Sequence, residues 1–372
     1  MKVNDIKLLH RLIFLGLFLF VTQRVYAGID STPLPRSHAS EELKSGIANL
    51  MDVITYKNLD LHSLMVVQNG CVVAEHYRGE GAAHRSHIMW SVSKTFTATA
   101  VGFAVEEHKL RLKDRVVSFF PDQLPVTMSR NLSRMTIRDL LTMTTGHTTD
   151  PTPSIDTDSI PSQSVDWVKT FFECPVEAKP GTYFLYNTLA SYVLSAIVQK
   201  VTGEKVVDYL TPRLFIPLGV EKPYWGESPQ GINKGGWGLY LKTEDMAKMG
   251  QLFLNEGLFN GQRIIPKKWI RMASSRQVSS VPGNYDYKRV IAQAGSPEHR
   301  KEEQEKFDSN NWFQGYCFQM WRGCHNTYRA DGMKGQLIIV IPEKKSVVVT
   351  TANIDDMPLE INLIWDYILP NL

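Results

Sequence analysis

The stretch His87–Asp114 reads HIMWSVSKTFTATAVGFAVEEHKLRLKD, and the strongest chemical signal of the chain lies within it. Ser91–Lys94 (SVSK) is the only S-x-x-K in the sequence, and it begins an Ala-rich run that predicts a helix from Ser91 to about Glu107. Residues three apart share one helical face, so the Ser91 hydroxyl and the Lys94 amine are expected to meet. The flanking residues are apolar, which favours a buried lysine over a solvated one.

This pairing fits nucleophilic catalysis. A serine hydroxyl is a weak nucleophile until a neighbouring base removes its proton, and a lysine can do so where desolvation lowers its pKa. The N-terminus of a helix also presents free backbone N–H groups where an oxyanion would form. The alternative is an ordinary Ser N-cap followed by a surface lysine, because S-x-x-K alone is a frequent tetrapeptide.

Other catalytic signatures are absent from the sequence. The chain has no G-x-S-x-G, no H-E-x-x-H, no Walker loop and no G-x-G-x-x-G. These absences argue against an α/β-hydrolase, a zincin and a nucleotide-dependent enzyme.

Charge and composition limit the partners. The chain has 372 residues, of which 43% are hydrophobic and 21% charged, as in a globular protein with a large core. The formal charge of +3 comes entirely from the first 27 residues, because the remaining 345 carry 37 basic and 37 acidic side chains. Nucleic acid therefore has no compositional support as a partner.

The N-terminus has the features of a secretory signal peptide. Lys2, Lys7 and Arg11 precede the ten-residue apolar run Leu12–Val21, and Val25–Ala27 supplies small residues for cleavage. The run is shorter than the roughly 20 residues of a spanning helix. We expect residues 1–27 to be removed and the mature protein to be periplasmic or secreted, without a stable membrane span. An uncleaved anchor is the alternative.

The order of elements predicts a sheet assembled from both ends of the chain. Leu64–Val67 and Cys71–Ala74 read as two strands joined by an Asn-Gly turn. Further strands are expected at Phe313–Trp321, Gln336–Ile341 and Ser346–Thr351, and a helix at Pro358–Leu369. The middle is expected to be helical, with helices at Ile137–Met143, Val165–Phe172, Leu189–Thr202 and Glu244–Asn255, the last capped by Thr243.

Two polar stretches interrupt the helical middle. His147–Ser164 is too long for an ordinary connection, so it is predicted to be a functional or mobile loop. Glu298–Asn311 is dense in charge and is predicted to be a solvated loop or helix. The four cysteines fit no zinc signature, and for Cys317 and Cys324 both a disulfide and isolated thiols remain open.

The stretch His87–Asp114 resembles the nucleophile helix of the beta-lactamase-related serine hydrolases. This family comprises class C beta-lactamases, penicillin-binding-protein-like DD-peptidases, related esterases and 6-aminohexanoate-dimer hydrolase. The similarity continues in the same order through Met135–His147, Pro180–Gly203, Gly235–Gly261 and Asp331–Pro342, and covers about residues 60–370. It implies a beta-lactamase/transpeptidase-like α/β (α+β) fold. The catalytic domain, 28–372, would have a sheet part at about 28–107 and 312–372 and a helical part at about 108–311.

The resemblance also implies roles for individual residues. Ser91 would be the acyl-forming nucleophile and Lys94 its proton-handling partner. Tyr186 matches the Tyr of the Y-x-N motif and would act as a phenolate or hydrogen-bonded base and as proton donor to the leaving group. The backbone N–H groups of Ser91 and Gln336 would form the oxyanion hole. No metal or cofactor is required.

The third family motif, K-T-G, is altered. Thr188 stands where Y-x-N has Asn, and Met333–Gly335 (MKG) stands where the family has K-T-G. Lys334 does not replace the missing lysine, because neighbouring residues on a strand point to opposite faces. Thr188, Met333 and Gly335 are therefore predicted as substrate-binding positions of altered specificity.

His147 and the tryptophans are weaker candidates. His147 is a substrate-binding candidate because it borders the cleft loop of the family, although a surface histidine is the simpler interpretation. Trp237, Trp312 and Trp321 are candidates for a pocket lining, with core packing as the alternative.

The expected function is that of an exported serine hydrolase that cleaves a small ester, amide or short peptide through a Ser91 acyl-enzyme. One alternative is a DD-peptidase or beta-lactamase, against which the altered third motif argues. The other is a non-catalytic cell-wall or peptide-binding protein, against which the intact Ser91, Lys94 and Tyr186 argue.

Overall fold

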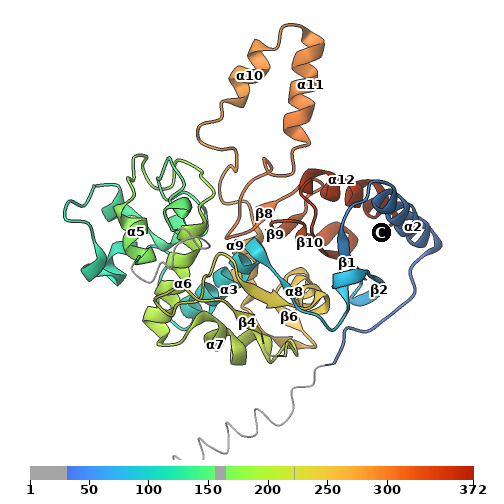
Figure 1. The fold of residues 1–372 in the computed structure, drawn as a ribbon, viewed down its shortest axis with the longest axis horizontal. Coiled ribbons are helices and arrows are strands. Elements are labelled where there is room, and N and C mark those ends of the chain that lie inside the picture. The colour runs from blue at the N-terminus through green and yellow to red at the C-terminus, as the bar shows by residue number, and fades with distance from the viewer. Residues whose placement is uncertain (1–31, 156–164, 222) are drawn as a thin grey trace, which may run out of the picture.

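A six-stranded antiparallel sheet forms one part of the molecule in the computed structural model, which describes residues 32–155, 165–221 and 223–372 (Figure 1). The strand order is β2-β1-β11-β10-β9-β8. The bounds are β1 (Leu61–Gln68), β2 (Cys71–Tyr77), β8 (Trp321–Arg322), β9 (Tyr328–Gly332), β10 (Gln336–Ile341) and β11 (Ser346–Ala352). The prediction of an antiparallel sheet built from both ends of the chain is confirmed.

The strands from the two ends of the chain meet inside the sheet, between β1 and β11. β1 pairs with β11 so that Val66 lies opposite Val348. β1 also pairs with β2 through the predicted Asn-Gly turn, where Asn69 and Gly70 have φ of 51° and 83°. Two consecutive left-handed residues are the requirement of a tight hairpin turn.

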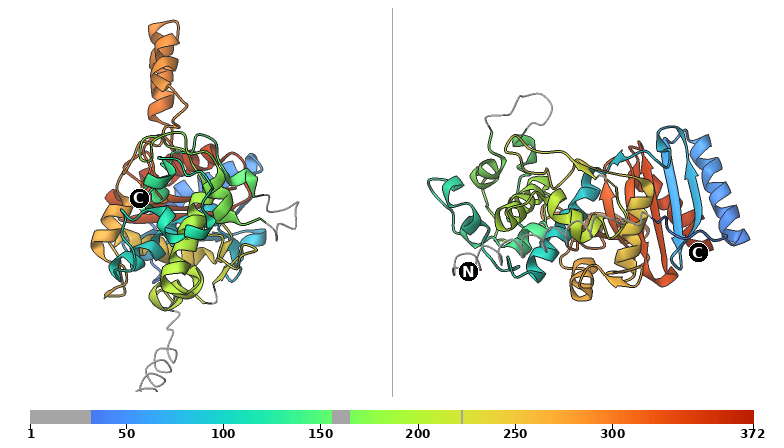
Figure 2. Two further views of the ribbon diagram at one scale, coloured as in Figure 1. Left: turned by 90° about the vertical axis from the view of Figure 1, so that its left-hand side faces the viewer. Right: turned by 90° about the horizontal axis from the view of Figure 1, so that it is seen from below.

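Helices cover both faces of this sheet. α8 (Thr243–Leu254) packs on β1, β10 and β11. α2 (Glu41–Tyr56) and α12 (Met357–Tyr367) lie over the other face, as the view from below shows (Figure 2). Side chains of β1 point alternately to the two faces of the sheet. Met65 and Val67 belong to the hydrophobic core on the α8 face, and Leu64 and Val66 belong to the core on the face covered by α2 and α12.

The remaining helices form the second part of the molecule, beside the sheet (Figures 1 and 2). They are α3 (Ser93–Glu106), α4 (Ile137–Leu141), α5 (Trp167–Glu173), α6 (Thr188–Thr202), α7 (Val206–Leu210) and α9 (Lys267–Ser274). α3 is buried along nearly its whole length and packs against α6. Short strands add two small sheets, formed by β3 (His87–Ile88), β5 (Leu239–Leu241) and β4 (Tyr224–Trp225), and by β6 (Leu258–Phe259) and β7 (Gln262–Arg263).

A pair of helices projects from the body. α10 (Tyr287–Gln293) and α11 (Pro297–Asp308) form a hairpin that rises above the rest of the molecule in Figure 1. Tyr287 and Phe307 stack at 4.0 Å between ring centroids and join the two helices. α11 has no buried residue, which confirms the prediction of a solvated segment.

Two expectations about the fold, one strand and one helix cap, were wrong in detail. Only Trp321 of the predicted strand Phe313–Trp321 is in a strand, because Gly315 and Gln319 have left-handed φ values of 125° and 57° that break an extended run. Thr243 does not cap α8. Lys242 is the N-cap residue, and the Thr243 hydroxyl bonds that of Ser63 instead.

The division into two parts does not follow the expected chain boundaries. α8 lies inside the expected helical range 108–311 but covers the sheet, while α3 lies inside the expected sheet range 28–107 but packs with the helices. The four cysteines, Cys71, Cys174, Cys317 and Cys324, are free thiols.

The predicted signal peptide, residues 1–27, lies outside the described residues. Along the described ranges, no helix combines the length and the apolar character that crossing a bilayer requires.

Candidate active site

Ser91 and Lys94 are in direct contact, as their spacing predicts. Ser91 lies in the 3₁₀ turn η2 (Trp90–Val92), and Lys94 lies in the first turn of α3 that follows. Lys94 Nζ is 2.8 Å from Ser91 Oγ and 2.8 Å from the carbonyl oxygen of Gly236. The lysine is 1% exposed, so its amine is held between these two oxygens and away from water.

Burial makes Lys94 a usable base. Loss of hydration lowers the pKa of Lys94 from 10.5 to about 7, although the negative charges of Asp150 and Asp331 act in the opposite direction. The neutral amine is therefore well populated near neutral pH, unlike that of a solvated lysine. A neutral amine 2.8 Å from a hydroxyl is able to accept its proton.

The segment at Gly235 and Gly236 holds the nucleophile helix in place. Thr97 Oγ1 donates to Gly235 O at 2.7 Å, and the Leu239 N–H donates to Ser93 Oγ at 3.2 Å. A Cβ on Gly236 would lie 2.9 Å from the Thr188 carbonyl oxygen and 3.4 Å from Lys94 Nζ. Only glycine therefore lets this backbone approach the lysine closely enough to accept its hydrogen bond.

Tyr186 completes the group beside Ser91. It directly precedes α6, whose N-cap Asn187 accepts a hydrogen bond from the Ala190 N–H at 3.0 Å. The Ser91 hydroxyl is close enough to lower the pKa of Tyr186, and Lys94 Nζ lies 5.0 Å from the centroid of the tyrosine ring. The Trp321 ring stacks on the Tyr186 ring, with 5.4 Å between their centroids.

Of the two forms expected for Tyr186, a phenolate and a hydrogen-bonded hydroxyl, the structure favours the hydroxyl. Burial raises the pKa of Tyr186 well above its ordinary value of 10, although the nearby Ser91 hydroxyl opposes the shift. The phenolate form is therefore disfavoured near neutral pH. Tyr186 remains a neutral hydroxyl that can donate or relay a proton, while Lys94 is the group that is free to accept one.

The turn between β9 and β10 forms the opposite wall. Met333 is 49% exposed and lines the same pocket as Ser91. Lys334, at φ 67°, turns its amine outward into an ion pair with Asp355, so it does not stand in for the lysine of the family motif.

Of the two residues Met333 and Gln336, only Met333 lines the pocket with Ser91. Gln336 is 3% exposed, pairs with Gly332 inside the β9–β10 ladder and does not line the pocket. The Met333 N–H makes no hydrogen bond to any residue in the described part of the chain. The structure therefore does not bring Gln336 to the pocket beside Ser91, where the expected oxyanion hole would place it.

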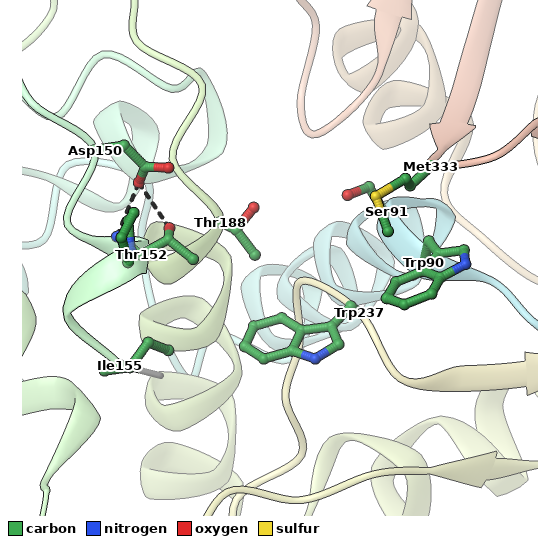
Figure 3. A pocket seen from close by; sticks show the side chains of 9 residues that line it. Trp90, Ser91, Asp150, Thr152, Ile155, Thr188, Trp237 and Met333 are labelled. Carbon is green, nitrogen blue, oxygen red and sulfur yellow. Dashed lines mark hydrogen bonds between the residues drawn. The ribbon is translucent and has the colours of Figure 1, made fainter. Parts of the chain in front are cut away.

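A pocket of about 430 Å³ opens in front of Ser91 (Figure 3). Figure 3 shows Asp150 and Thr152 on one side, Ser91 and Met333 on the other, and the Trp237 indole between them. The lining residues are Trp90, Ser91, Asp150, Thr152, Pro153, Ile155, Thr188, Trp237 and Met333. Thr188 and Met333 thus occupy the position predicted for substrate contacts.

Asp150 is the one charged side chain in this lining, and sequence reasoning missed it. Its Oδ1 accepts hydrogen bonds from Thr152 N–H at 3.0 Å and from Thr152 Oγ1 at 2.7 Å, which fix the carboxylate in place. The available signal was its position in the unusually long polar loop that begins at His147.

Trp90 is a second residue of the pocket lining that the sequence did not indicate. It precedes the nucleophile at φ 43°, a left-handed conformation that is costly for a bulky residue and that is frequent at functional sites.

Two predicted substrate-binding residues do not reach the pocket. His147 is fully buried, with Nδ1 2.9 Å from Thr145 Oγ1 and Nε2 3.3 Å from the Phe171 carbonyl oxygen. This burial lowers the pKa of His147 to about 4. Gly335 lies on the inner side of its turn, where its carbonyl oxygen accepts a hydrogen bond from Thr350 Oγ1 at 3.0 Å.

No metal site accompanies this arrangement in the part of the chain that the structure describes, because no three His, Cys, Asp or Glu side chains are grouped to hold an ion. The site therefore combines a serine with a lysine whose pKa is lowered to about 7 and with a tyrosine that stays protonated.

Comparison with known proteins defines the class. Solved structures share the fold at TM-scores of 0.68 for a candidate 6-aminohexanoate-dimer hydrolase from Bacillus anthracis and 0.65 for EstCE1, a hydrolase with promiscuous acyltransferase activity. They are 19% and 16% identical and align with 90% and 88% of this chain, and with 87% and 98% of their own. At these identities the likeness establishes the fold alone, which is beta-lactamase/transpeptidase-like.

The sequence comparison establishes the family. The model of the Beta-lactamase family matches residues 62–369, so this chain belongs to that family. The 6-aminohexanoate-dimer hydrolase of Paenarthrobacter ureafaciens is 24% identical over 223 residues, which are 56% of this chain. The match spans 55% of the length of that relative.

Proposed function

We propose that this protein is an exported serine hydrolase that cleaves an ester or amide bond through an acyl-enzyme on Ser91. The observation that carries the proposal is the 2.8 Å contact between Lys94 Nζ and Ser91 Oγ, made by a buried lysine whose neutral amine is well populated near neutral pH. Membership of the Beta-lactamase family supports the same chemistry.

The residues suggest a sequence of proton movements. Lys94 accepts the Ser91 proton while Oγ attacks the carbonyl carbon of the substrate, and the carbonyl oxygen becomes an oxyanion. We assign the N–H groups of Ser91 and Met333 as the donors to that oxyanion. Lys94 then returns the proton through the Tyr186 hydroxyl to the departing alcohol or amine. Water, activated by the same groups, attacks the acyl-enzyme and releases the acid.

The experiment compares wild type with Ser91→Ala on p-nitrophenyl esters and short linear amides. We expect the variant to lose at least about 10³-fold in kcat, because the attacking atom is gone. Ser118→Ala, which removes an exposed hydroxyl outside the site, is the matched control and keeps full activity. A fluorophosphonate probe should label Ser91 and no other serine. Full activity in Ser91→Ala, or labelling elsewhere, contradicts the proposal.

The pocket supports a neutral or cationic substrate rather than an anionic one. Its lining contains the carboxylate of Asp150 and no lysine or arginine, while Lys334 is turned away to Asp355. The carboxylate faces two indoles, Trp90 and Trp237, across the space in front of Ser91, and aromatic faces also attract cations (Figure 3). Beta-lactams and D-Ala-D-Ala peptides carry a carboxylate, so this lining argues against both.

Two matched esters test the substrate class. One carries a trimethylammonium group at the end of its acyl chain and the other carries the isosteric tert-butyl group. We expect Asp150→Asn to lower kcat/KM about tenfold for the cationic ester and to leave the neutral ester unchanged, since only the charge attraction is removed. Asp122→Asn, an exposed site outside this pocket, is the control. Equal losses on both esters contradict a cation-binding role.

Export rests on the N-terminal sequence and has its own test. Expression of the full chain followed by N-terminal sequencing of the protein outside the cytoplasm should give Gly28 as the first residue. An intact Met1 on all of the protein contradicts signal cleavage.

A further inference from the structure

The turn that carries Met333 is held from behind through its carbonyl groups. Each of its three carbonyl oxygens accepts one hydrogen bond from the neighbouring strands or the segment after them. The pairs are Met333 O with Gln336 Nε2 at 3.2 Å, Lys334 O with the Ile354 N–H at 3.0 Å, and Gly335 O with Thr350 Oγ1 at 3.0 Å. These three bonds hold the backbone of the turn, and with it the position of Met333 on the wall of the pocket.

Thr350 has two neighbours but only one proton. Its Oγ1 lies 3.0 Å from Gly335 O and 2.8 Å from Glu360 Oε1. A carbonyl oxygen only accepts, so the hydroxyl proton must point to Gly335 if that bond is to exist. The contact with Glu360 is then a hydrogen bond only if the carboxyl is protonated and donates to Thr350 Oγ1.

The surroundings of Glu360 favour this neutral form. Glu360 is 4% exposed, and it has no ion pair among the described residues. The side chains that share its small cavity are apolar except for Thr350: they come from α2, β1, α12 and the segments beside them (Leu50, Ile54, Leu59, Leu61, Leu64, Ile354, Leu363, Ile364).

The charged groups nearest to Glu360 do not favour its ionised form. Asp331 on β9 acts on it with a like charge and is itself paired with the buried Arg329, 2.9 Å away. Lys334, in the turn, is paired with Asp355. Burial and the charge of Asp331 raise the pKa of Glu360 from 4.5 to about 8.

We propose that Glu360, as a neutral carboxylic acid, is a positioning residue that holds the Met333–Gly335 turn through Thr350 and so keeps Met333 in place beside Ser91 in the pocket. This inference rests on the proposed hydrolase function. Glu360 touches neither the substrate nor Ser91. It acts by donating to Thr350 Oγ1, which leaves the threonine proton free for Gly335 O.

The sign of the pH effect follows from this hydrogen-bond chain. Below the Glu360 pKa of about 8 the acid donates and the turn is held. Above it the carboxylate attracts the Thr350 proton, and Gly335 O loses its donor. Activity should therefore fall on the alkaline side, while the acid side of the profile follows the ionisation of Lys94 near pH 7.

The test is the pH profile of kcat for a neutral p-nitrophenyl ester between pH 6 and 9.5. We expect the wild-type kcat to fall about tenfold above pH 8, less than the loss of a whole oxyanion donor. Glu360→Gln, whose amide donates at every pH, should keep the neutral-pH kcat within about twofold and lose the alkaline fall. KM should stay unchanged in both proteins.

Thr350 gives an independent pair of variants. Thr350→Val removes the hydroxyl while keeping the shape, and it should lower kcat about tenfold at all pH values with no alkaline fall. Thr350→Ser keeps the hydroxyl and should behave as wild type. This pair decides the question if Glu360→Gln does not fold, as judged by circular dichroism. Asp245→Asn, which alters another buried carboxyl at the start of α8, should leave the profile unchanged.

The outcomes separate this inference from the proposed function. An alkaline fall that persists in Glu360→Gln, a folded Glu360→Gln that is inactive at neutral pH, or a Thr350→Val that behaves as wild type overturns the positioning role. If Ser91→Ala retains activity, the hydrolase proposal fails first, whatever the Glu360 variants show.

Discussion

Replacing Lys94 by methionine should remove most of the activity and at the same time stabilise the protein. The side chains have similar volumes, so the packing around α3 is kept. The change removes a proton acceptor that lies 2.8 Å from Ser91 Oγ, and general-base contributions of this kind are worth about 10²–10⁴-fold in kcat.

The stability gain follows from the pKa of Lys94. A fall from 10.5 to about 7 means that folding places the ammonium form in surroundings that disfavour it. At pH 7 the unfolded chain is fully protonated at this lysine, and the difference costs the folded state about 4 kcal/mol. Methionine avoids this cost but leaves Gly236 O without its donor, a loss of about 1–2 kcal/mol. We expect a net gain of about 2–3 kcal/mol at pH 7.

The pH dependence distinguishes this cause from ordinary repacking. The cost of the buried lysine is complete below pH 7 and disappears as the pH rises to 10.5, where the unfolded lysine is also neutral. The advantage of Lys94→Met should therefore shrink between pH 7 and 10 in guanidinium unfolding curves. Lys200→Met, an exposed lysine on α6, is the control and should change little. A Lys94→Met protein that is less stable than wild type at pH 7, or whose advantage does not change with pH, refutes the argument.

Three further outcomes are expected. Tyr186→Phe should lower kcat about 10²-fold or more on amides but much less on p-nitrophenyl esters in a side-by-side rate assay, because p-nitrophenolate leaves without a proton. Gly335→Ala should destabilise the protein by about 2–4 kcal/mol in urea unfolding, since its Cβ would lie 2.1 Å from Glu360 Oε2 at φ 88°. Gly70→Ala, at φ 83° with nothing within 4 Å, should cost only about 1 kcal/mol. Glu360→Gln should gain stability over wild type as the pH rises from 4.5 to about 8, by about 3 kcal/mol at pH 7, because the unfolded glutamate loses its proton first; equal pH dependence of the two unfolding curves contradicts this.

Local patterns predicted the elements of the fold that carry their own signals. The Asn-Gly turn between β1 and β2 and the glycine that ends α6, at φ 78°, are local requirements of backbone geometry. The same holds for Ser91 and Lys94, which are neighbours on one helical turn.

The features of the fold and the site that the sequence did not predict depend on contacts between residues far apart in the chain. Gln319 interrupts the expected strand because its side chain binds Ser191 on α6 and the carbonyl oxygens of Leu140 and Leu141 on α4, which are distant in sequence. The turn that places Met333 on the pocket wall is held by bonds from Thr350 and Ile354, and the residue type of Met333 carries no trace of them. Asp150 was missed for the same reason, since a carboxylate in a polar loop has no distinctive local pattern.

The position of β1 between β2 and β11 has a consequence for the order in which the chain folds. β1 pairs on one side with β2, which is close in sequence, and on the other with β11, more than 270 residues later. The sheet therefore cannot close until nearly the whole chain has been synthesised, and such non-local pairing slows folding. For a chain that is exported as proposed, this delay keeps the polypeptide unfolded while it is threaded through a membrane, and the catalytic pocket forms only after the last strand has arrived.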